Sequence, residues 1–515
     1  MAQGSGGGEI AAKRGKLSSS GAGAAGEDRL SALPDDILVL ILLGLGSTAR
    51  AARTSVLSRR WRHLWAILPE LRFYHSPDGH RIREVLGAPD PPPPLRWISV
   101  TAKDSGPDSL GAWLPEAARR LSGDLVYKIR VPRVDEEAEE EDQAGERGAV
   151  QLPCFENAAG IYLSLGFLGL ALPFSGTFAR LILLRLHRVR FHGPCELGHV
   201  VSSQSQRCPC LQKLSVRYSR GVDKLTIHSE SLLRLNLWCL KGLRQLTVVA
   251  PALKELKLFR CFTENQPIAD ISTPQLVSLE WRDSYDPSSV QLGDLGQLQR
   301  LKTDLSLVYW EHGSRENHGI LKLLQQFRFI HNHIINITLA YLQDIDNLPY
   351  SMEDLTVLPH TTFLIMEILN NGHGFGPSSF HMLRLCTDIR RLSLVLHTLR
   401  DLESSCQSGC NCEQPTNWNT EELSLNRVEE VEITGLKGAD HEVVSVERLF
   451  SWAMVLKKMK MTFDKSVSKS QARELLQTLA SFSKPETVVE FYMYHDADKE
   501  SPYLLTPEDR IVTYH

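Results

Sequence analysis

The chain has 515 residues, more than one ordinary hydrophobic core accommodates, so we expect two to four domains. Apolar residues make up 42% of the chain and charged residues 23%, a composition typical of soluble globular domains. The formal net charge of −4 gives no overall positive field that would attract nucleic acid or an anionic membrane, so we expect neither as a partner.

Residues 1–26 are rich in Gly, Ala and Ser, which predicts a disordered tail, and they lack the apolar segment of a secretory signal. We therefore expect a reducing compartment, the nucleus and/or the cytoplasm, with most of the ten cysteines as small buried apolar residues. Lys13, Arg14 and Lys16 form a basic cluster in the tail. A nuclear import signal is one interpretation of this cluster, and a solvated tail is the preferred one.

Residues 27–73 predict a compact block of three helices. Pro34 suits a first helical position, Asp35 and Asp36 favour the positive end of the helix dipole, and Gly44 and Gly46 end the helix. The block is too small to bury its own apolar surface, which must be covered either by another protein or by the rest of the chain. The apolar positions recur at helical spacing in the first helix (Ile37, Leu38, Ile41, Leu42, Leu45) and the third (Leu57, Trp61, Leu64, Trp65), and Ala49, Ala51 and Ala52 mark the second.

Two segments beyond this block read as connections. Residues 74–97 include Pro91–Pro94 and predict a stiff linker, and the acidic run 135–142 predicts a solvated loop. Residues 157–179 carry no charge and are long enough to span a bilayer. We favour buried strands for them, because the segment contains several glycines and a proline and alternates with the period of a strand.

A leucine-rich repeat is predicted within residues 98–400. The pattern Leu-x-Leu/Val/Ile recurs with later spacings of 21, 21 and 23 residues, and shorter copies begin at Leu225 and Leu246. The shorter copies predict two strands per repeat in a stacked solenoid, and a flat β-sandwich is the alternative. The repeat blurs between 300 and 400, where Leu392-x-Leu394 is one more copy. The full copies begin at Leu184, Leu214, Leu235, Leu256 and Leu279, and each has a leucine three residues earlier, at Leu181, Leu211, Leu232, Leu253 and Leu276.

Residues 401–515 alternate strand and helix patterns in the order β-α-β-α-β, which predicts a small α/β unit that caps the edge of the solenoid. The first strand is marked by Val431 and Ile433, the second by Met459 and Met461, and the last by Val489. Helical stripes lie between them, at residues 446–456 and 472–479.

The sequence contains no catalytic signature and no phosphate-binding loop. Gly372–Gly376 is rich in glycine but lacks the spacing of a nucleotide-binding loop, so we interpret it as a flexible loop. Cys406, Cys410 and Cys412 could supply three zinc ligands, with His397 or Cys386 as a fourth. Because paired C-x2-C motifs are missing, loop thiols without a metal are the preferred interpretation, and we predict no metal site and no cofactor.

Two parts of the sequence resemble known regions of plant proteins. Asp28–Leu38 resembles the start of a plant F-box, and Ala52–Trp65 resembles its end closely. Trp418–Phe463 resembles the FBD region that follows the repeats in many of these proteins. The FBD match rests on Val431-Glu432-Ile433-Thr434-Gly435, on Gly438 and Glu442, and on Leu456-Lys457-Lys458-Met459, and the chain departs from the F-box pattern at Gly46, where many members have proline.

The resemblance to the F-box/FBD/LRR family implies an α+β multidomain fold: a small three-helix F-box (27–73), a leucine-rich-repeat solenoid (98–400) and a small C-terminal α/β FBD unit (401–515). It implies a non-catalytic substrate-recognition subunit of a Skp-cullin-F-box ubiquitin ligase, whose repeats bind an unknown protein substrate. A binding scaffold outside any ligase is the alternative. The family positions that dock on the Skp-type adaptor correspond to Leu33, Pro34, Ile37, Leu38, Ile41, Val56, Leu57 and Trp61.

Overall fold

The computed structural model divides into two compact units, Met1–Leu68 and Pro69–His515. The tail 1–26, residues Asp28–Ser31, the prolines 91–93, the acidic run 135–142 and Cys406 lie outside the described residues. The structure describes residues 32–74, 78–87, 94–103, 106–130, 148–192, 197–202, 206–262, 266–305, 308–309, 315–327, 333–345, 347–386, 388–397, 410–494 and 502–505.

The first unit contains helices at the three places where the sequence predicts them. They are α1 (Asp35–Gly44), α2 (Thr48–Arg53) and α3 (Arg59–Ala66), with a short 3-10 turn η1 (Thr54–Val56) before α3. Gly46 follows α1 with a φ of +68°, a left-handed conformation that commonly ends helices. Proline cannot adopt it, because its ring fixes φ near −65°, so the turn of this chain requires a residue other than proline. The core of the unit is formed by Leu38, Leu42, Ala51, Trp61 and Leu64.

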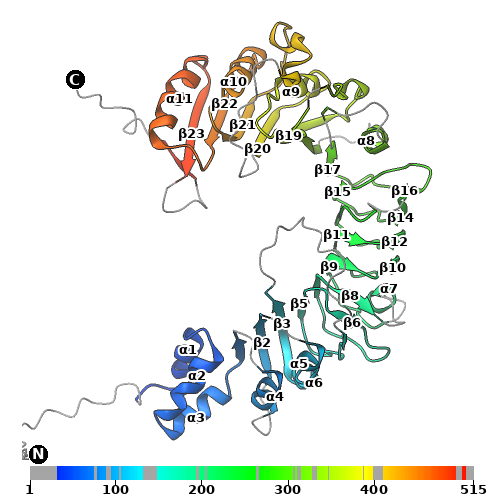
Figure 1. The fold of residues 1–515 in the computed structure, drawn as a ribbon, viewed down its shortest axis with the longest axis vertical. Helices are drawn as coiled ribbons and strands as arrows, with labels where there is room; N and C mark the ends of the chain where they lie inside the picture. The colour runs from blue at the N-terminus through cyan, green and yellow to red at the C-terminus, as the bar shows by residue number, and fades with distance from the viewer. Residues whose placement is uncertain are drawn as a thin grey trace, which may run out of the picture. The chain divides into compact units, whose positions relative to one another are not determined.

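The second unit is built on one long sheet whose strands are almost all parallel to their neighbours (Figure 1). Among the strands that the structure describes, β24 (Pro502–Leu504) alone is antiparallel to the strand beside it. Along the sheet, the strands follow the order β1 (Glu70–Phe73), β2 (Leu95–Ala102), β3 (Leu121–Ile129), β5 (Gly160–Ser164), β7 (Leu183–His187), β9 (Lys213–Arg220), β11 (Arg234–Lys241), β13 (Glu255–Phe259), β15 (Ser278–Arg282), β17 (Arg300–Leu305), β18 (His333–Ala340), β19 (Thr361–Leu369), β20 (Arg391–His397), β21 (Glu430–Leu436), β22 (Lys458–Phe463) and β23 (Val488–Tyr494).

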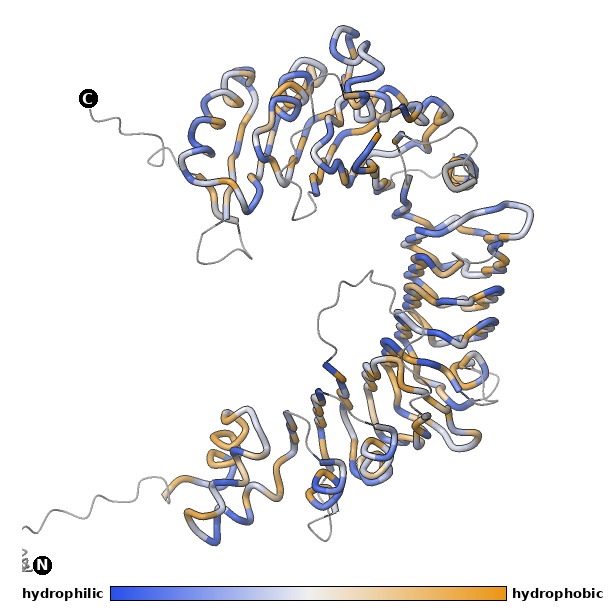
Figure 2. The backbone as a smooth tube through the Cα atoms, in the orientation of Figure 1, coloured by the Kyte–Doolittle hydropathy of each residue, from blue (hydrophilic) through white to orange (hydrophobic). Residues whose placement is uncertain are grey.

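The register of this sheet confirms the predicted repeat. Leu235 pairs with Leu214 on one side and with Leu256 on the other, and Leu256 pairs with Leu279. These leucines are buried, whereas the residues between them point to the opposite face, as the two-residue period of a strand requires. Figure 2 shows the apolar positions recurring as short bands along the strands. The leucines three residues before each pair, Leu181, Leu211, Leu232, Leu253 and Leu276, are buried as well.

A second row of strands confirms the prediction of two strands per repeat. Leu225 and Leu246, which begin the shorter copies, are paired neighbours in a four-stranded parallel sheet. Because neighbouring strands are parallel in both sheets, the structure is consistent with a repeat solenoid rather than with the alternative of a flat β-sandwich. The second row comprises β4 (Ala149–Gln151), β6 (Gly169–Ala171) and β8 (Arg190–His192), then β10 (Lys224–His228), β12 (Gln245–Val249), β14 (Ile268–Ser272) and β16 (Val290–Leu292).

Toward both ends of the second unit, helices replace this second row. The change explains why the repeat blurs in the sequence: Leu301 pairs with Ile335 across 34 residues (335 minus 301), against 21 residues between Leu235 and Leu256. Figure 1 shows α9, α10 and α11 side by side along strands β19 to β23. The helical elements are α4 (Gly79–Gly87), α5 (Pro107–Gly111), α6 (Leu114–Arg120), α7 (Leu197–Val201), α8 (Arg315–Gln326), α9 (Gly376–Arg384), α10 (Asp440–Trp452) and α11 (Lys469–Ser481), with 3-10 turns η3 (Met352–Asp354), η4 (Asn411–Glu413) and η5 (Thr416–Asn419).

Three expectations differ from the structure at the borders of the sheet. The predicted linker 74–97 contains α4 and the first residues of β2. Strand β1, placed by the sequence in the helical block, pairs with β2 and belongs to the sheet. The C-terminal strands and helices form in the predicted order, but β21 pairs with β20, so they continue the sheet rather than cap it as a separate unit.

The uncharged segment 157–179 forms strands, as we predicted. It contains β5 and β6, joined through Gly166 and Phe167, which both have positive φ values. In the part of the chain that the structure describes, no helix is long and apolar enough to cross a membrane.

Candidate interaction surfaces

The first unit exposes large apolar side chains. Val56 is 83% exposed, Leu57 63% and Leu40 61%, and Ile37 and Ile41 are exposed to a smaller extent. Helix α1 is apolar on all sides, because its sequence after the two aspartates is Ile-Leu-Val-Leu-Ile-Leu-Leu-Gly. A helix with this composition is normally buried on every side, so the exposed face of α1 is suited to a protein partner.

The structure sorts the eight predicted docking residues into two groups. Ile37, Ile41, Val56 and Leu57 are exposed, Pro34 is exposed and Leu33 is half-buried. By contrast, Leu38 is 0% exposed and Trp61 is 7% exposed. Both side chains belong to the core of the unit, and the assignment of the eight residues to an adaptor interface stays a prediction. Leu40 is the exposed residue that sequence reasoning missed, because a helix that is apolar all round gives no signal for its outer face.

Arg60 fixes how the start of α1 lies against α3. Its Nε donates a hydrogen bond to Asp35 Oδ1 over 2.7 Å, and its Nη2 donates to the Leu33 carbonyl oxygen over 2.6 Å. The Asp35 carboxylate and the Leu33 carbonyl lie on either side of Pro34, where α1 begins. Arg60 therefore holds the first turn of α1 in place beside the exposed residues.

The second unit presents a different surface on the outer face of the long sheet, which is the face that points away from the buried leucines. One outward residue from each of five successive strands lies in register. Trp238 and Phe259 stack with ring centroids 4.1 Å apart, which forms an aromatic centre. The Arg217 guanidinium lies 5.4 Å from the Trp238 ring and that of Arg282 lies 4.7 Å from the Phe259 ring, so a cation covers each end. This aromatic row is made by His187, Arg217, Trp238, Phe259 and Arg282.

Paired charges continue from the aromatic row along the same face. Arg282 Nε donates to both carboxylate oxygens of Asp304 over 2.7 Å, and Lys302 Nζ lies 2.7 Å from Glu367 Oε1. Burial raises the pKa of the Glu367 carboxyl, but the hydrogen bonds from Lys302 and Asn336 outweigh it, so the pKa lies below its usual value. The carboxylate is therefore charged at neutral pH, and this part of the face is suited to a polar partner surface.

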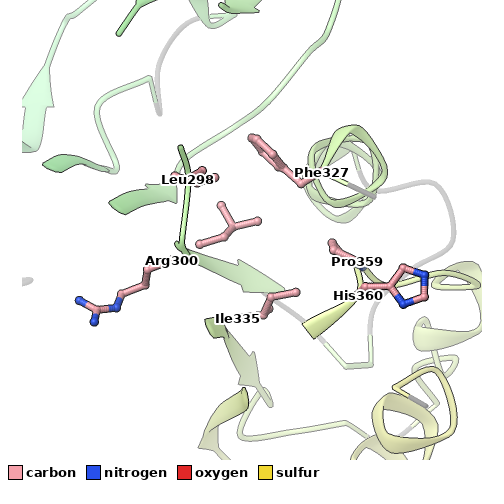
Figure 3. A pocket seen from close by; sticks show the side chains of 7 residues that line it. Leu298, Arg300, Phe327, Ile335, Pro359 and His360 are labelled. Carbon is pink, nitrogen blue, oxygen red and sulfur yellow. The ribbon is translucent and has the colours of Figure 1, made fainter. Parts of the chain in front are cut away.

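A small apolar hollow lies behind the sheet, between the end of α8 and strands β17 and β18 (Figure 3). Its cavity volume of about 10 Å³ is far below the ~300–1,000 Å³ typical of small-molecule sites. Arg300 lines the rim but is exposed, and its side chain extends away from the hollow. We therefore assign it no ligand. The lining residues are Leu298, Arg300, Leu301, Phe327, Ile335, Pro359 and His360.

No family model matches the chain. It is 30% identical over 272 residues to an F-box/FBD/LRR-repeat protein of Arabidopsis thaliana, covering 48% of this chain and 58% of that protein. A second such protein from this plant is 29% identical over 305 residues, covering 55% of this chain and 57% of that protein.

The chain is therefore similar to plant F-box/FBD/LRR-repeat proteins over about half of its length. It spans less than two thirds of the length of the relatives just named. A further Arabidopsis F-box/FBD/LRR-repeat protein is 57% identical, but over 47 residues only, which cover 9% of this chain and 10% of that protein. Identity in the family is therefore much higher in one short stretch than over the longer alignments.

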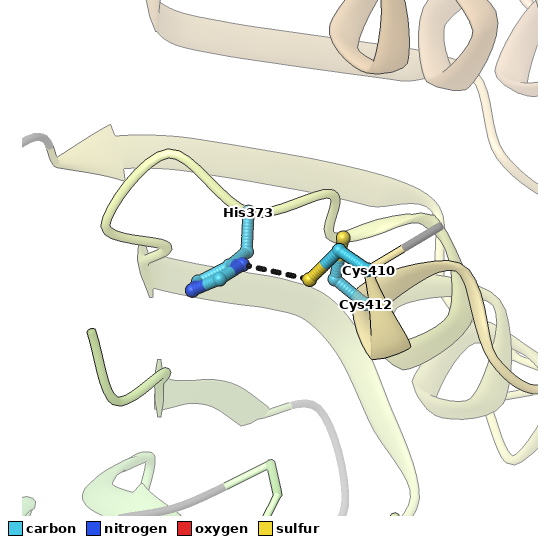
Figure 4. A group of neighbouring side chains, drawn as sticks. All are labelled: His373, Cys410 and Cys412. Atoms are coloured by element: carbon cyan, nitrogen blue, oxygen red, sulfur yellow. Dashed lines mark hydrogen bonds between the residues drawn. The ribbon is translucent and has the colours of Figure 1, made fainter. Parts of the chain in front are cut away.

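One cluster of side chains in this chain was not foreseen. The structure brings His373 to Cys410 and Cys412, where the sequence suggested His397 or Cys386 (Figure 4).

The glycine-rich segment Gly372–Gly376 that carries His373 is packed rather than open. A side chain on Gly376 would lie 2.5 Å from the Trp418 ring, so only glycine permits this contact. The expectation of a flexible loop is therefore wrong, because residues beyond position 410 cover it.

Proposed function

We propose that this chain is the substrate-recognition subunit of a Skp-cullin-F-box ubiquitin ligase. The first unit docks on a Skp-type adaptor, and the outer face of the repeats binds a protein substrate. The observation that carries the proposal is the apolar surface of the first unit, formed by Ile37, Leu40, Ile41, Val56 and Leu57. A unit this small keeps such a surface exposed only at a cost in solubility, which a resident partner removes.

The aromatic row is the proposed substrate contact. Interface hot spots are enriched in Trp and Arg, and here Trp238 and Phe259 lie between Arg217 and Arg282 on rigid neighbouring strands. The exposed Arg217 at one end favours a substrate segment with an acidic side chain beside an apolar or aromatic one, whereas Arg282 at the other end is already paired with Asp304. Strand positions hold these groups in fixed register, so little ordering is required on binding.

The proposed mechanism involves no bond chemistry in this chain, and it requires no cofactor. The adaptor, through its cullin, holds a ubiquitin-charged enzyme, while the repeats hold the substrate in the same assembly. Attack by a substrate lysine then becomes effectively intramolecular, and its rate rises through effective concentration and orientation. Such a subunit acts in the nucleus and/or the cytoplasm. We also assign the continuous strand-helix segment from Trp418 to Phe463 as the FBD region.

The direct test measures adaptor binding by the full chain carrying Val56→Asp and Leu57→Asp. Both substitutions change exposed apolar residues at the end of η1. Because neither side chain is part of the core, the double variant should fold normally. We expect its affinity for a purified Skp-type adaptor to fall by roughly thirtyfold or more, equivalent to about 2 kcal/mol. Biolayer interferometry measures the affinity, and thermal melting verifies the fold.

A matched control places the same charge on exposed apolar surface elsewhere. Ile268 on β14 is 48% exposed, so Ile268→Asp should leave adaptor affinity unchanged. In cells, the full-length double variant should bind substrate without recruiting cullin and should lengthen the half-life of that substrate. Equal adaptor binding by the double variant and the wild type would contradict the docking surface, and a wild-type chain that binds no adaptor would support a scaffold outside the ligase.

A further inference from the structure

The cluster of His373, Cys410 and Cys412 joins two segments that are distant in the sequence. His373 lies in the loop between β19 and α9, and the two cysteines lie at η4, between β20 and β21. The ligand atoms of the three side chains all lie within 4.8 Å of one another, and His373 Nδ1 is 3.4 Å from Cys410 Sγ (Figure 4). In a tetrahedral zinc site, bonds of ~2.0–2.3 Å place neighbouring ligand atoms roughly 3.3–3.8 Å apart. The three atoms are thus within a small adjustment of that geometry.

The hydrogen bonding of His373 prepares Nδ1 as a ligand. Its Nε2 lies 3.1 Å from the Gln343 carbonyl oxygen. A carbonyl only accepts, so Nε2 carries the hydrogen and Nδ1 keeps its lone pair toward the sulfur. A second hydrogen bond of this kind is typical of histidines that bind metals, because it fixes the tautomer and the ring orientation.

The backbone around His373 is also fixed. The His373 N–H donates to the Asn370 carbonyl oxygen over 2.8 Å, and Asn370 Nδ2 donates to the His373 carbonyl oxygen over 2.9 Å. His373 and Cys412 are buried, whereas Cys410 is half-buried. One side of the cluster therefore remains accessible to an entering ion, while His373 is held in place by its hydrogen bonds.

A second observation at the same place concerns a neighbouring buried histidine. His441, in the first turn of α10, lies beside the cluster: a side chain added to Gly374 would be 3.6 Å from both Cys412 Sγ and His441 Cβ. His441 Nε2 is shielded from solvent and has no hydrogen-bond partner among the described residues. Buried polar nitrogens are normally satisfied, so an ion with its bound water would supply a partner here.

We propose that His373, Cys410 and Cys412 form a binding site for one Zn²⁺ ion, with the fourth position taken by water. Two thiolates and one imidazole are the donors that zinc prefers in proteins. On binding, each cysteine releases its thiol proton to solvent and His373 binds as the neutral imidazole, so the site loses two protons and gains the ion.

The ion would have a structural role in the connection between β20 and β21, the longest between paired strands of the described sheet. Leu392 of β20 pairs with Val431 of β21 across 39 residues (431 minus 392). The end of that connection covers α9, where the Trp418 ring meets Gly376. It also contacts Tyr309, whose hydroxyl donates to the Gln414 carbonyl oxygen over 2.8 Å. A metal link that closes a long connection removes much conformational freedom from the unfolded chain. The zinc would thus hold this covering segment on the sheet.

The first test needs no variant. The full chain is purified without chelator, and its metal content is measured by mass spectrometry, with about one zinc per chain expected. Cys410 should then be protected from alkylation and should become reactive after zinc is removed by a chelator. Cys210, which is exposed in the repeats, serves as the internal control and should react equally in both states. A chain without zinc after incubation with zinc and dialysis, or equal alkylation of Cys410 in both states, would overturn the proposal.

The second test uses the full chain with Cys410→Ser and Cys412→Ser, and Cys210→Ser as the matched control. We expect the double variant to lose its zinc and the control to retain it, with circular dichroism as the measure of folding. Cobalt substitution of the wild-type chain should give the absorption of tetrahedral cobalt with thiolate ligands. Zinc retained in full by the folded double variant would show that the ion binds elsewhere, and it would end the assignment.

Discussion

The first unit and the repeat sheet expose opposite kinds of surface. In the first unit, the exposed side chains are aliphatic and neighbour one another along α1 and at Val56 and Leu57. On the outer face of the sheet, the aromatic row is flanked by guanidinium groups and continues into paired charges such as Lys302 and Glu367.

The difference reflects how each unit is stabilised. The repeats bury a continuous layer of leucines, so their outer face is free to carry polar and aromatic groups. The first unit has few residues, and much of its apolar content stays outside its core. Binding by the first unit should therefore depend on apolar burial and vary little with salt, whereas binding by the sheet should depend on charge and weaken as salt rises.

The largest expected effect tests whether Trp61 of the first unit is a core residue or an adaptor contact. Trp61 is buried there, so Trp61→Ala should destabilise the unit by ~3–5 kcal/mol through lost burial and a cavity. That loss is comparable to the whole stability of a core this small, so adaptor binding should disappear because the unit unfolds. Hydrogen exchange of the amides of α1 and α3 measures the loss. Persisting protection, with adaptor binding alone reduced, would instead make Trp61 a contact residue.

A somewhat smaller effect is expected in the repeats. Leu256 is fully buried between Leu235 and Leu279, so Leu256→Ala should cost ~2–5 kcal/mol and weaken the neighbouring repeats as well. Lys257, the next residue on the same strand, points outward, and Lys257→Ala should cost less than about 1 kcal/mol. Chemical denaturation monitors both variants, and equal midpoints would mean that the assigned register is wrong.

The turn after α1 gives a third, smaller expectation. Gly46 has a φ of +68° and open space around it, so the cost of replacing it comes from the backbone alone. Gly46→Ala should destabilise the first unit by ~1–2 kcal/mol, and Gly46→Asn by less, because asparagine tolerates this conformation. Gly46→Pro should be the most destabilising of the three. Thermal melts rank the variants, and a stable proline variant would show that this turn can adopt a second conformation.

The smallest effect on stability is expected at the aromatic row. Trp238→Ala removes the stacking on Phe259 and the contact with Arg217 but leaves the leucine layer intact, so the loss should be ~1 kcal/mol. Substrate binding should fall far more than stability, whereas adaptor affinity should remain at the wild-type level. Parallel affinity measurements for substrate and adaptor distinguish the two, and unchanged substrate binding would remove the row from the contact surface.

Several features of this protein could be determined from the sequence by itself. The leucine spacing predicted the strand positions, the pairing of Leu235 with Leu256 and the two strands per repeat, because strand period and repeat length are local properties. Helical spacing predicted α1, α10 and α11, and Pro34 and Gly44 marked the ends of the first. The predicted stripe 446–456 begins after the start of α10 and runs past its end at Trp452. The apolar surplus of the first unit was also evident from composition and size.

Only the tertiary structure decided which of these apolar residues form the core. Helix α1 is apolar on every side, so its sequence could not show that Leu38 faces inward and Leu40 outward. The same holds where the function depends on distant segments. The aromatic row draws one residue from each of five strands, and the cluster of His373 with Cys410 joins positions 37 residues apart. Sequence patterns report the local period of the chain, whereas these contacts arise from how the strands stack, which is a property of the whole fold.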